Sequence, residues 1–305
     1  MLFLTEQQFR RTVNVDQVIA AIRAAFVRGF STVRMPVRTS FELDGAILLI
    51  MPCYDSALNA AGVKLVSVSS KGVQASYELL DPKTGITIAR MEANYLTDLR
   101  TAATSALATD LLVRQDAKTL GVFGSGRQAQ IHFAVLPRVR RFERFLVCGS
   151  GRSDVSAFCA KMKAEQGITI EPVTPEICAR ESDVICTCTT AAEPLFDGRW
   201  PSPGTHLNLV GAFQPHTREV YETVRRARVV VDIHDGALAE AGDLLIPMKH
   251  GTIGREHILA DLHEIASGKK TVRRSRDDIT LFKSVGCALE DLVTAQLVYE
   301  HLKSS

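Results

Sequence analysis

The chain has 305 residues and a formal net charge of +2, with 46% hydrophobic and 23% charged residues. This length is enough for two domains with buried cores, and the composition is that of ordinary soluble proteins. The balanced charge gives no reason to expect nucleic acid or a membrane surface as a partner. The N-terminus lacks the apolar core of a signal peptide, and no apolar run approaches membrane-spanning length, so we expect a cytoplasmic protein.

The seven cysteines are scattered and form no CxxC pair. The eight histidines show no HxxxH or HExxH spacing. We therefore expect free thiols in a reduced compartment. We expect neither a disulfide framework nor a metal site.

The first third of the chain predicts two helices around a sheet. Residues 14–30 carry apolar residues at helical spacing, with an Asn/Asp start and a glycine near the end. Residues 33–92 contain short apolar runs separated by turns, and "DPKTG" (81–85) is a hairpin signal. This segment predicts an antiparallel sheet. Residues 94–113, rich in Ala and Leu, predict a long helix.

From residue 117 the pattern alternates between strand and helix. The predicted strands are 119–123, 144–148, 168–173, 183–190, 204–212 and 226–233, and the predicted helices are 126–136, 154–167 and 174–182. Such alternation favours an α/β fold with a mostly parallel, doubly wound Rossmann sheet. The run 284–303 predicts a last helix that no strand follows, which makes it a candidate to pack back on the first domain.

The tetrapeptide GSGR occurs twice, each time after a predicted strand. The first copy extends to GSGRQA (124–129), a G-x-G-x-x-A match that opens a helix. In this spacing Gly124 permits a tight turn, Gly126 lets the backbone approach a pyrophosphate, and Ala129 lets the helix pack on the strand. The alternative is a plain strand-to-helix turn.

The second copy lies where a dinucleotide fold reads the adenosine ribose. NAD-specific sites usually carry Asp or Glu there, but this chain has no acid before Asp154. Arg152 between Ser150 and Ser153 would instead attract a 2′-phosphate. We therefore expect NADPH as cofactor. The alternative is a solvated loop in an NADH enzyme.

Three cationic residues stand in apolar or small-residue surroundings: Arg38 in "RMPVRTSF", Lys64 in "AGVKLVSVSS" and Arg100 in "LTDLRTAATSA". Each must find a partner or water. Taken singly, each is also explained as an ordinary surface residue.

Five blocks in order resemble the ornithine cyclodeaminase/μ-crystallin family, over about residues 2–302. They are "ARMEANYLTDLRTAATSALAT", "GVFGSGRQAQ", "DGRWPSPGTHLNLVGAFQPHTREV", "VVVDIHDGALAEAGDL" and "DDITLFKSVGCALEDLVTAQLVYE". The resemblance implies a substrate-binding and dimerisation domain of residues 1–115 plus 284–305, and a Rossmann NAD(P)-binding domain of residues 116–283. It also implies a homodimer and an active site in the cleft between the domains.

The resemblance places Arg38, Lys64 and Arg100 around the substrate carboxylate and reacting nitrogen. Beside the glycines and Ser125 of the first turn, it implies further cofactor contacts at Arg127, Gln128, Thr189 and Ser284. Asp232 matches a recurrent family acid, to which we assign no role in the chemistry.

Two positions discriminate among the family's activities. Phe213 stands where ornithine cyclodeaminase has an essential aspartate, and Leu49 falls near its substrate-binding glutamate. Without an anionic partner a diamino acid is a poor substrate. The expected activity is NADPH-dependent reduction of Δ1-pyrroline-2-carboxylate, or of Δ1-piperideine-2-carboxylate, to L-proline or L-pipecolate. The alternatives are an ornithine cyclodeaminase or alanine dehydrogenase, and a non-catalytic NADPH/ligand-binding protein like μ-crystallin.

Overall fold

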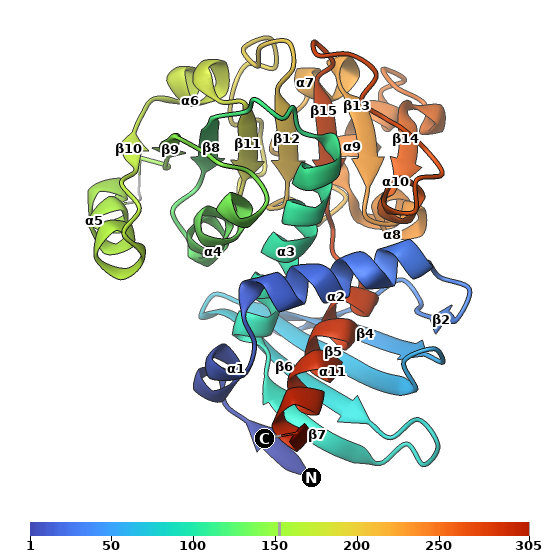
Figure 1. The fold of residues 1–305 in the computed structure, drawn as a ribbon. Helices are drawn as coiled ribbons and strands as arrows, with labels where there is room; N and C mark the ends of the chain where they lie inside the picture. The colour runs from blue at the N-terminus through green and yellow to red at the C-terminus, as the bar shows by residue number, and fades with distance from the viewer. Residues whose placement is uncertain (152–153, 305) are drawn as a thin grey trace. The chain divides into compact units, whose positions relative to one another are not determined.

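The computed structural model describes residues 1–151 and 154–304. The chain forms two compact units, of which unit 1 is Met1–Thr104 with Gly286–Ser305 and unit 2 is Ser105–Val285. The boundary falls inside α3 (Asn94–Leu112), the long helix that the sequence predicted. Figure 1 shows the elements of each unit.

Unit 1 contains a seven-stranded sheet in the order β1-β7-β6-β5-β4-β2, with β3 also paired to β4. Strands β2 to β7 pair antiparallel, as predicted, but β1 adds a parallel pairing with β7 that the sequence analysis missed. The strands are β1 (Leu2–Leu4), β2 (Val33–Arg34), β3 (Thr39–Leu43), β4 (Ala46–Asp55), β5 (Ala60–Ser69), β6 (Gly72–Leu80) and β7 (Thr87–Glu92).

The helices of unit 1 cover one face of this sheet. Alternate residues of β4 and β5, including Met51 and Lys64, are buried on the face that contacts α11 (Ala288–Ser304). Helix α2 (Val15–Arg28) packs against α11, and α1 (Glu6–Thr12) precedes it. A capping box between Asn14 and Gln17 fixes the start of α2. The last predicted helix therefore belongs to the core of unit 1.

Unit 2 is a doubly wound α/β fold, as predicted. Its eight-stranded sheet has the order β10-β9-β8-β11-β12-β15-β13-β14, and the strand pairs are parallel. The strands are β8 (Thr119–Phe123), β9 (Arg144–Cys148), β10 (Glu171–Pro172), β11 (Val184–Thr187), β12 (His206–Leu209), β13 (Arg228–Val231), β14 (Ile258–Asp261) and β15 (Thr280–Lys283).

Side chains alternate along β8 between two hydrophobic clusters, one on each face of the sheet. Leu120 and Val122 belong to one cluster, and Phe123 belongs to the other. The helices of unit 2 are α4 (Arg127–Val135), α5 (Val155–Gln166), α6 (Pro175–Glu181), α7 (Glu222–Arg226), α8 (His234–Glu240), α9 (Gly242–Lys249) and α10 (Leu262–Ala266). Two buried layers explain why the strands read as continuous apolar runs.

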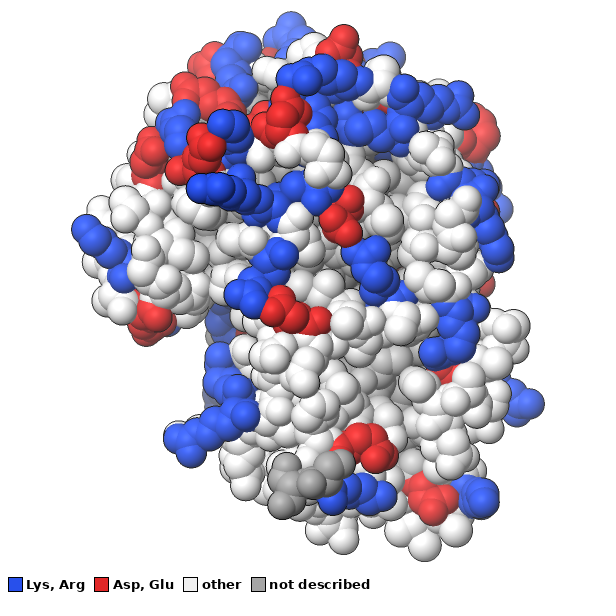
Figure 2. Space-filling view, in the orientation of Figure 1, with Lys and Arg blue, Asp and Glu red and all other residues white. Residues whose placement is uncertain are grey.

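Charged side chains of both signs are mixed on the surface. Figure 2 shows acidic and basic side chains interspersed on the upper part of the face drawn. Among the exposed side chains, Arg180 pairs with Glu176 and Arg144 pairs with Glu171. Among the described residues, no helix is both long and apolar enough to cross a membrane.

Candidate substrate and cofactor sites

Lys64 is buried in unit 1 and paired with an acid. Its side chain is 1% exposed, and its Nζ lies 2.8 Å from Asp291 Oδ1 on α11. The pKa of Lys64 is lowered to about 8, by burial first and then by the positive charges of Arg100 and Arg38, against the opposing effect of Asp291. Lys64 is therefore a stronger acid than an exposed lysine.

Arg100, on α3, joins the same acids. Its Nη1 lies 2.7 Å from Glu290 Oε2, and its Nε lies 2.9 Å from Asp291 Oδ1. Burial opposes the charged form, but the carboxylates of Asp291 and Glu290 raise the pKa of Arg100 above its usual value. Gly286 permits this packing, because a Cβ there would lie 2.4 Å from Arg100 Nη1.

Arg38 completes the cationic set from the segment between β2 and β3, and its side chain is partly exposed. Its charge acts on Lys64, so unit 1 brings the three predicted cations together. Three cations and two carboxylates leave this cluster with one formal positive charge. That balance suits a ligand with a single carboxylate.

Sequence reasoning missed the two acids, Glu290 and Asp291. They are 1% and 0% exposed on α11, among buried apolar residues. The sequence feature that could have identified them is two adjacent acids inside the apolar run "GCALEDLVTAQLV". Buried acids in such a run require cationic partners, which Lys64 and Arg100 provide.

Two buried polar atoms close to Lys64 have unused hydrogen-bonding capacity. Within the described part of the chain, Asp291 Oδ2 and the Tyr77 hydroxyl have no hydrogen-bond partner. Tyr77 pairs directly with Lys64 across the sheet, and its ring covers Gly62. Burial, together with the negative charge of Asp291, raises the pKa of Tyr77 well above its usual value. These two atoms therefore keep hydrogen-bonding capacity that the described residues do not use.

Leu49 lies on the same sheet face as Lys64, since it pairs with Val66 and Met51 pairs with Lys64. It is 7% exposed, in the apolar core. A leucine at this position could not neutralise a distal ammonium.

In unit 2, the first glycine turn has the context that a phosphate-binding turn requires. Gly124 follows β8 with φ of +111°, and a Cβ there would lie 2.4 Å from the Cys188 carbonyl oxygen. Gly126 is the N-cap of α4, without a side-chain cap and with open space where a Cβ would lie. Ala129, in the first turn of α4, is fully buried. The turn therefore fits a dinucleotide pyrophosphate at the helix start.

The other predicted cofactor residues of this turn lie at its mouth. Ser125 is partly exposed, Arg127 is exposed and Gln128 is partly exposed. These side chains are accessible to a ligand at the start of α4.

The second glycine turn begins beside the first. Phe123 and Cys148, the last residues of β8 and β9, are paired, and the Gly124 amide donates to the Cys148 carbonyl at 2.7 Å. Ser150 is exposed, while Arg152 and Ser153 lie outside the described residues. Asp154 caps α5 by accepting from the Ala157 amide at 2.9 Å, which engages the first acid after β9.

Thr189 and Ser284 follow β11 and β15 at the same edge of the sheet. The last residues of these strands are in register with β12, through Thr187 with Leu209 and Leu209 with Lys283. Ser284 is 2% exposed, and its Oγ lies 3.4 Å from Asp232 Oδ2. Asp232 also accepts from the Val285 amide at 2.7 Å, so this acid orders the turn after β15.

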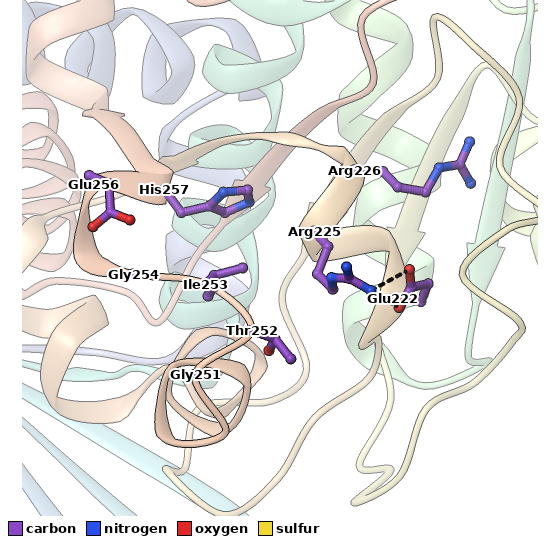
Figure 3. A pocket seen from close by; sticks show the side chains of 9 residues that line it. All are labelled: Glu222, Arg225, Arg226, Gly251, Thr252, Ile253, Gly254, Glu256 and His257. Atoms are coloured by element: carbon purple, nitrogen blue, oxygen red, sulfur yellow. Dashed lines mark hydrogen bonds and ion pairs between the residues drawn. The ribbon is translucent and has the colours of Figure 1, made fainter.

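A pocket of about 480 Å³ lies at the opposite edge of the sheet. Figure 3 shows it between α7, which precedes β13, and residues 251–257, which precede β14. Several of its polar groups are already engaged: Arg225 pairs with Glu222 at 3.0 Å, and His257 Nε2 lies 2.6 Å from the Val224 carbonyl oxygen. We assign it no part in the cofactor site.

Among the described residues of unit 2, three side chains that could bind a metal ion lie close together. His234, Asp261 and Glu264 offer ligand atoms within 4.8 Å of one another. However, Glu264 already pairs with Lys270 at 2.9 Å and forms a capping box with Asp261. Asp261 and Glu264 are thus explained by the capping of α10, and we do not assign a metal site to this group.

Comparison with known proteins identifies the family. The model of the ornithine cyclodeaminase/mu-crystallin family matches residues 1–305. A Δ1-pyrroline-2-carboxylate reductase of Bacillus cereus is 34% identical over 317 residues, covering 98% of this chain and 96% of the relative. The mouse ketimine reductase mu-crystallin is 35% identical over 320 residues, covering 99% and 97%.

A solved structure is also similar throughout. The Δ1-pyrroline-2-carboxylate reductase of Thermococcus litoralis, in complex with NADH and L-proline, has a TM-score of 0.96 and 38% identity, covering 100% of this chain and 98% of that chain. The full-length family match and these relatives give one answer. The chain belongs to the ornithine cyclodeaminase/mu-crystallin family.

Proposed function

We propose that the chain is a nicotinamide-dependent ketimine reductase, an oxidoreductase that acts on the C=N bond of a cyclic α-imino acid. The proposed substrate is Δ1-pyrroline-2-carboxylate, reduced to L-proline, with Δ1-piperideine-2-carboxylate, reduced to L-pipecolate, as the six-membered counterpart. The observation that carries the proposal is the buried cluster of Lys64, Arg100 and Asp291 in unit 1. The names of the relatives from Bacillus, mouse and Thermococcus support the same reaction class.

In the proposed mechanism, the arginines hold the substrate carboxylate. Glu290 and Asp291 fix the Arg100 guanidinium, while Arg38 is partly exposed and can approach the ligand. Arginine suits this task because its planar group can pair with both carboxylate oxygens. The net positive charge of the cluster is then neutralised by the substrate.

Lys64 is the proposed proton donor. The nicotinamide cofactor, when bound, supplies a hydride to the imine carbon. Lys64 gives a proton to the imine nitrogen, so the C=N bond becomes a C–N bond with one added hydrogen at each atom. A pKa of about 8 keeps Lys64 mostly protonated at neutral pH while making it a better acid than a free lysine.

Three features of unit 2 support cofactor binding there: the turn at Gly124, the uncapped start of α4, and the edge position of Thr189 and Ser284. We propose that these groups, with Ser125, Arg127 and Gln128, hold the nicotinamide cofactor. Phe213, in the loop after β12, is an apolar residue at the position where a cyclodeaminase has an acid, which favours a cyclic imine over a diamino acid as substrate.

The apolar outer face of the unit 1 sheet supports a homodimer. The central residues Leu48, Ile50, Val63 and Leu65 are partly exposed on the face opposite α11, and Phe41 on β3 is 56% exposed. Exposed apolar patches of this kind mark interfaces. We propose that a second copy covers them, which the sedimentation mass of the intact protein tests.

The decisive experiment mixes the protein with a panel of cyclic imines and either NADH or NADPH, and follows the nicotinamide absorbance. We expect oxidation of the cofactor with Δ1-pyrroline-2-carboxylate. Cofactor binding without oxidation across the panel would instead support a ligand-binding protein. Proline and ammonia from ornithine, without net cofactor change, would support a cyclodeaminase.

We propose a preference for NADPH, carried by Ser150, Arg152 and Ser153. Replacing Arg152 with Asp puts an acid where NAD enzymes carry one, and should reverse the preference by repelling the 2′-phosphate. The ratio of kcat/KM for NADPH to that for NADH should fall at least about 10-fold, for one lost charge-assisted contact. Arg141→Asp, at an exposed site before β9, is the control. An unchanged ratio would remove Arg152 from cofactor selection.

A further inference from the structure

Three charged side chains are fully buried together in unit 2, outside the groups assigned above. Glu219, Asp243 and Lys283 are each 0% exposed. Lys283 Nζ lies 3.0 Å from Asp243 Oδ2. Burial and the negative charge of Asp243 raise the pKa of Glu219 above its usual value. Burying charged groups costs free energy unless their hydrogen bonds and ion pairs compensate. The contacts of these three side chains therefore indicate their role in the fold.

The Glu219 carboxylate ties together the segments that follow β11 and β12. Its Oε1 accepts from the Thr189 amide at 3.0 Å and from the Thr189 hydroxyl at 2.6 Å. Its Oε2 accepts from the Thr187 hydroxyl at 2.6 Å and from the amides of Gly211 and Ala212 at 2.8 and 3.2 Å. One side chain therefore fixes both turns.

The other two charges hold Glu219 and the same turns in place. Asp243 Oδ1 accepts from the Glu219 amide at 2.7 Å and from the Val220 amide at 3.1 Å. Lys283 donates to the carbonyl oxygens of Leu209 and Ala212. Asp243 thus holds the backbone at Glu219, and Lys283 holds the turn after β12.

A close backbone approach gives independent support for this arrangement. A Cβ on Gly211 would lie 2.1 Å from the Thr189 carbonyl oxygen and 2.5 Å from Glu219 Oε1. Only glycine fits there without displacing the two turns or the carboxylate. The turns after β11 and β12 are therefore packed directly against each other.

The location of these turns identifies what they shape. In a doubly wound fold the dinucleotide lies across the carboxyl edge at the point where strand order reverses, here between β8 and β11. In this arrangement the glycine turns after β8 and β9 contact the pyrophosphate and the adenosine ribose of the dinucleotide. The nicotinamide half therefore falls to the turns after β11 and β12, which Glu219 holds.

We propose that Glu219 is a positioning residue that fixes Thr189 and the Gly211–Ala212 turn around the nicotinamide half of the cofactor. This inference rests on the proposed function. It concerns a residue that acts through its neighbours, because the buried carboxylate is satisfied by the protein itself.

The test compares two ligands by calorimetry: NADH, and ADP-ribose, which lacks the nicotinamide. In Glu219→Gln the new amide group faces hydroxyl and amide donors, so the turns should shift. The Kd for NADH should rise at least about 10-fold, because hydrogen bonds to a charged group are lost. The Kd for ADP-ribose should stay within about 2-fold of the unmodified protein, since its turns are elsewhere on the edge.

Matched variants keep the result interpretable. Glu222→Gln, at a partly exposed glutamate on α7, should bind both ligands normally. If Glu219→Gln does not fold, Thr187→Val removes one donor to Glu219 Oε2 and should give the same selective loss in smaller measure. Equal losses for both ligands, or no loss in a folded variant, would overturn the inference alone. Failure of the unmodified protein to bind NADH or NADPH would overturn the proposed function with it.

Discussion

Replacing Lys64 with Met should lower kcat for imine reduction at least about 100-fold, because a positioned proton donor typically contributes about 10²–10⁴. Methionine has similar length and no proton to give. Losing one partner of a buried ion pair should lower stability, but the fold should survive, because Asp291 keeps its 2.9 Å contact with Arg100 Nε when the lysine is absent. Initial rates under saturating imine and cofactor measure the effect.

Cofactor binding separates a chemical role of Lys64 from general damage. NADH and NADPH should bind Lys64→Met with unchanged Kd, since the proposed cofactor groups belong to unit 2. Lys71→Met changes an exposed lysine in the β5–β6 turn and should keep full activity. Full turnover in Lys64→Met would show that another group or water protonates the imine.

The acid strength of Lys64 also predicts a pH dependence. The donor form of a lysine with a pKa of about 8 is present below that pH and is lost above it. kcat should therefore be nearly flat below about pH 8 and fall about tenfold per pH unit above it. A rate independent of pH up to about 10 would contradict the role of Lys64 as the donor.

The fold was predictable where local pattern and spacing agree. Strand, glycine turn and helix follow each other at 119–136, and the structure has β8, Gly124 and α4 there. The signal was weaker for short elements. The predicted strand 168–173 is reduced to Glu171–Pro172, and β14 and β15, each of four residues, were not predicted. Such short strands are defined by their neighbours in the sheet rather than by their own sequence.

The candidate sites also contain residues that the sequence predicted and residues that it did not. Arg38, Lys64 and Arg100 could be named because a cation among apolar residues stands out. Their acidic partners could not, since Asp291 lies 227 residues from Lys64 and only the packing of α11 on β5 brings them together. Glu219 was hidden for a different reason: "TREV" looks like an exposed turn, and its burial depends on two other turns.

Asp291→Asn should change both stability and the pH profile. In the folded protein Asp291 pairs with Lys64 and with Arg100, and all three side chains are buried. Removing one partner of a buried ion pair costs about 3–5 kcal/mol, so the melting temperature should fall clearly. Asparagine keeps the size and one acceptor oxygen, which favours a folded variant.

The pH profile distinguishes Asp291 as a positioning residue from a merely structural one. Its negative charge raises the pKa of Lys64, against the effects of burial and Arg100. Without that charge, Lys64 should lose its proton at lower pH, and the alkaline limb of kcat should move below about pH 8. Glu300→Gln, at an exposed site on the same helix, should leave the limb in place. If Asp291→Asn is destabilised but the alkaline limb of kcat does not move, the role of Asp291 is only to hold α11 against the sheet. A limb that returns toward its original position in Asp291→Glu would tie the shift to the carboxylate charge.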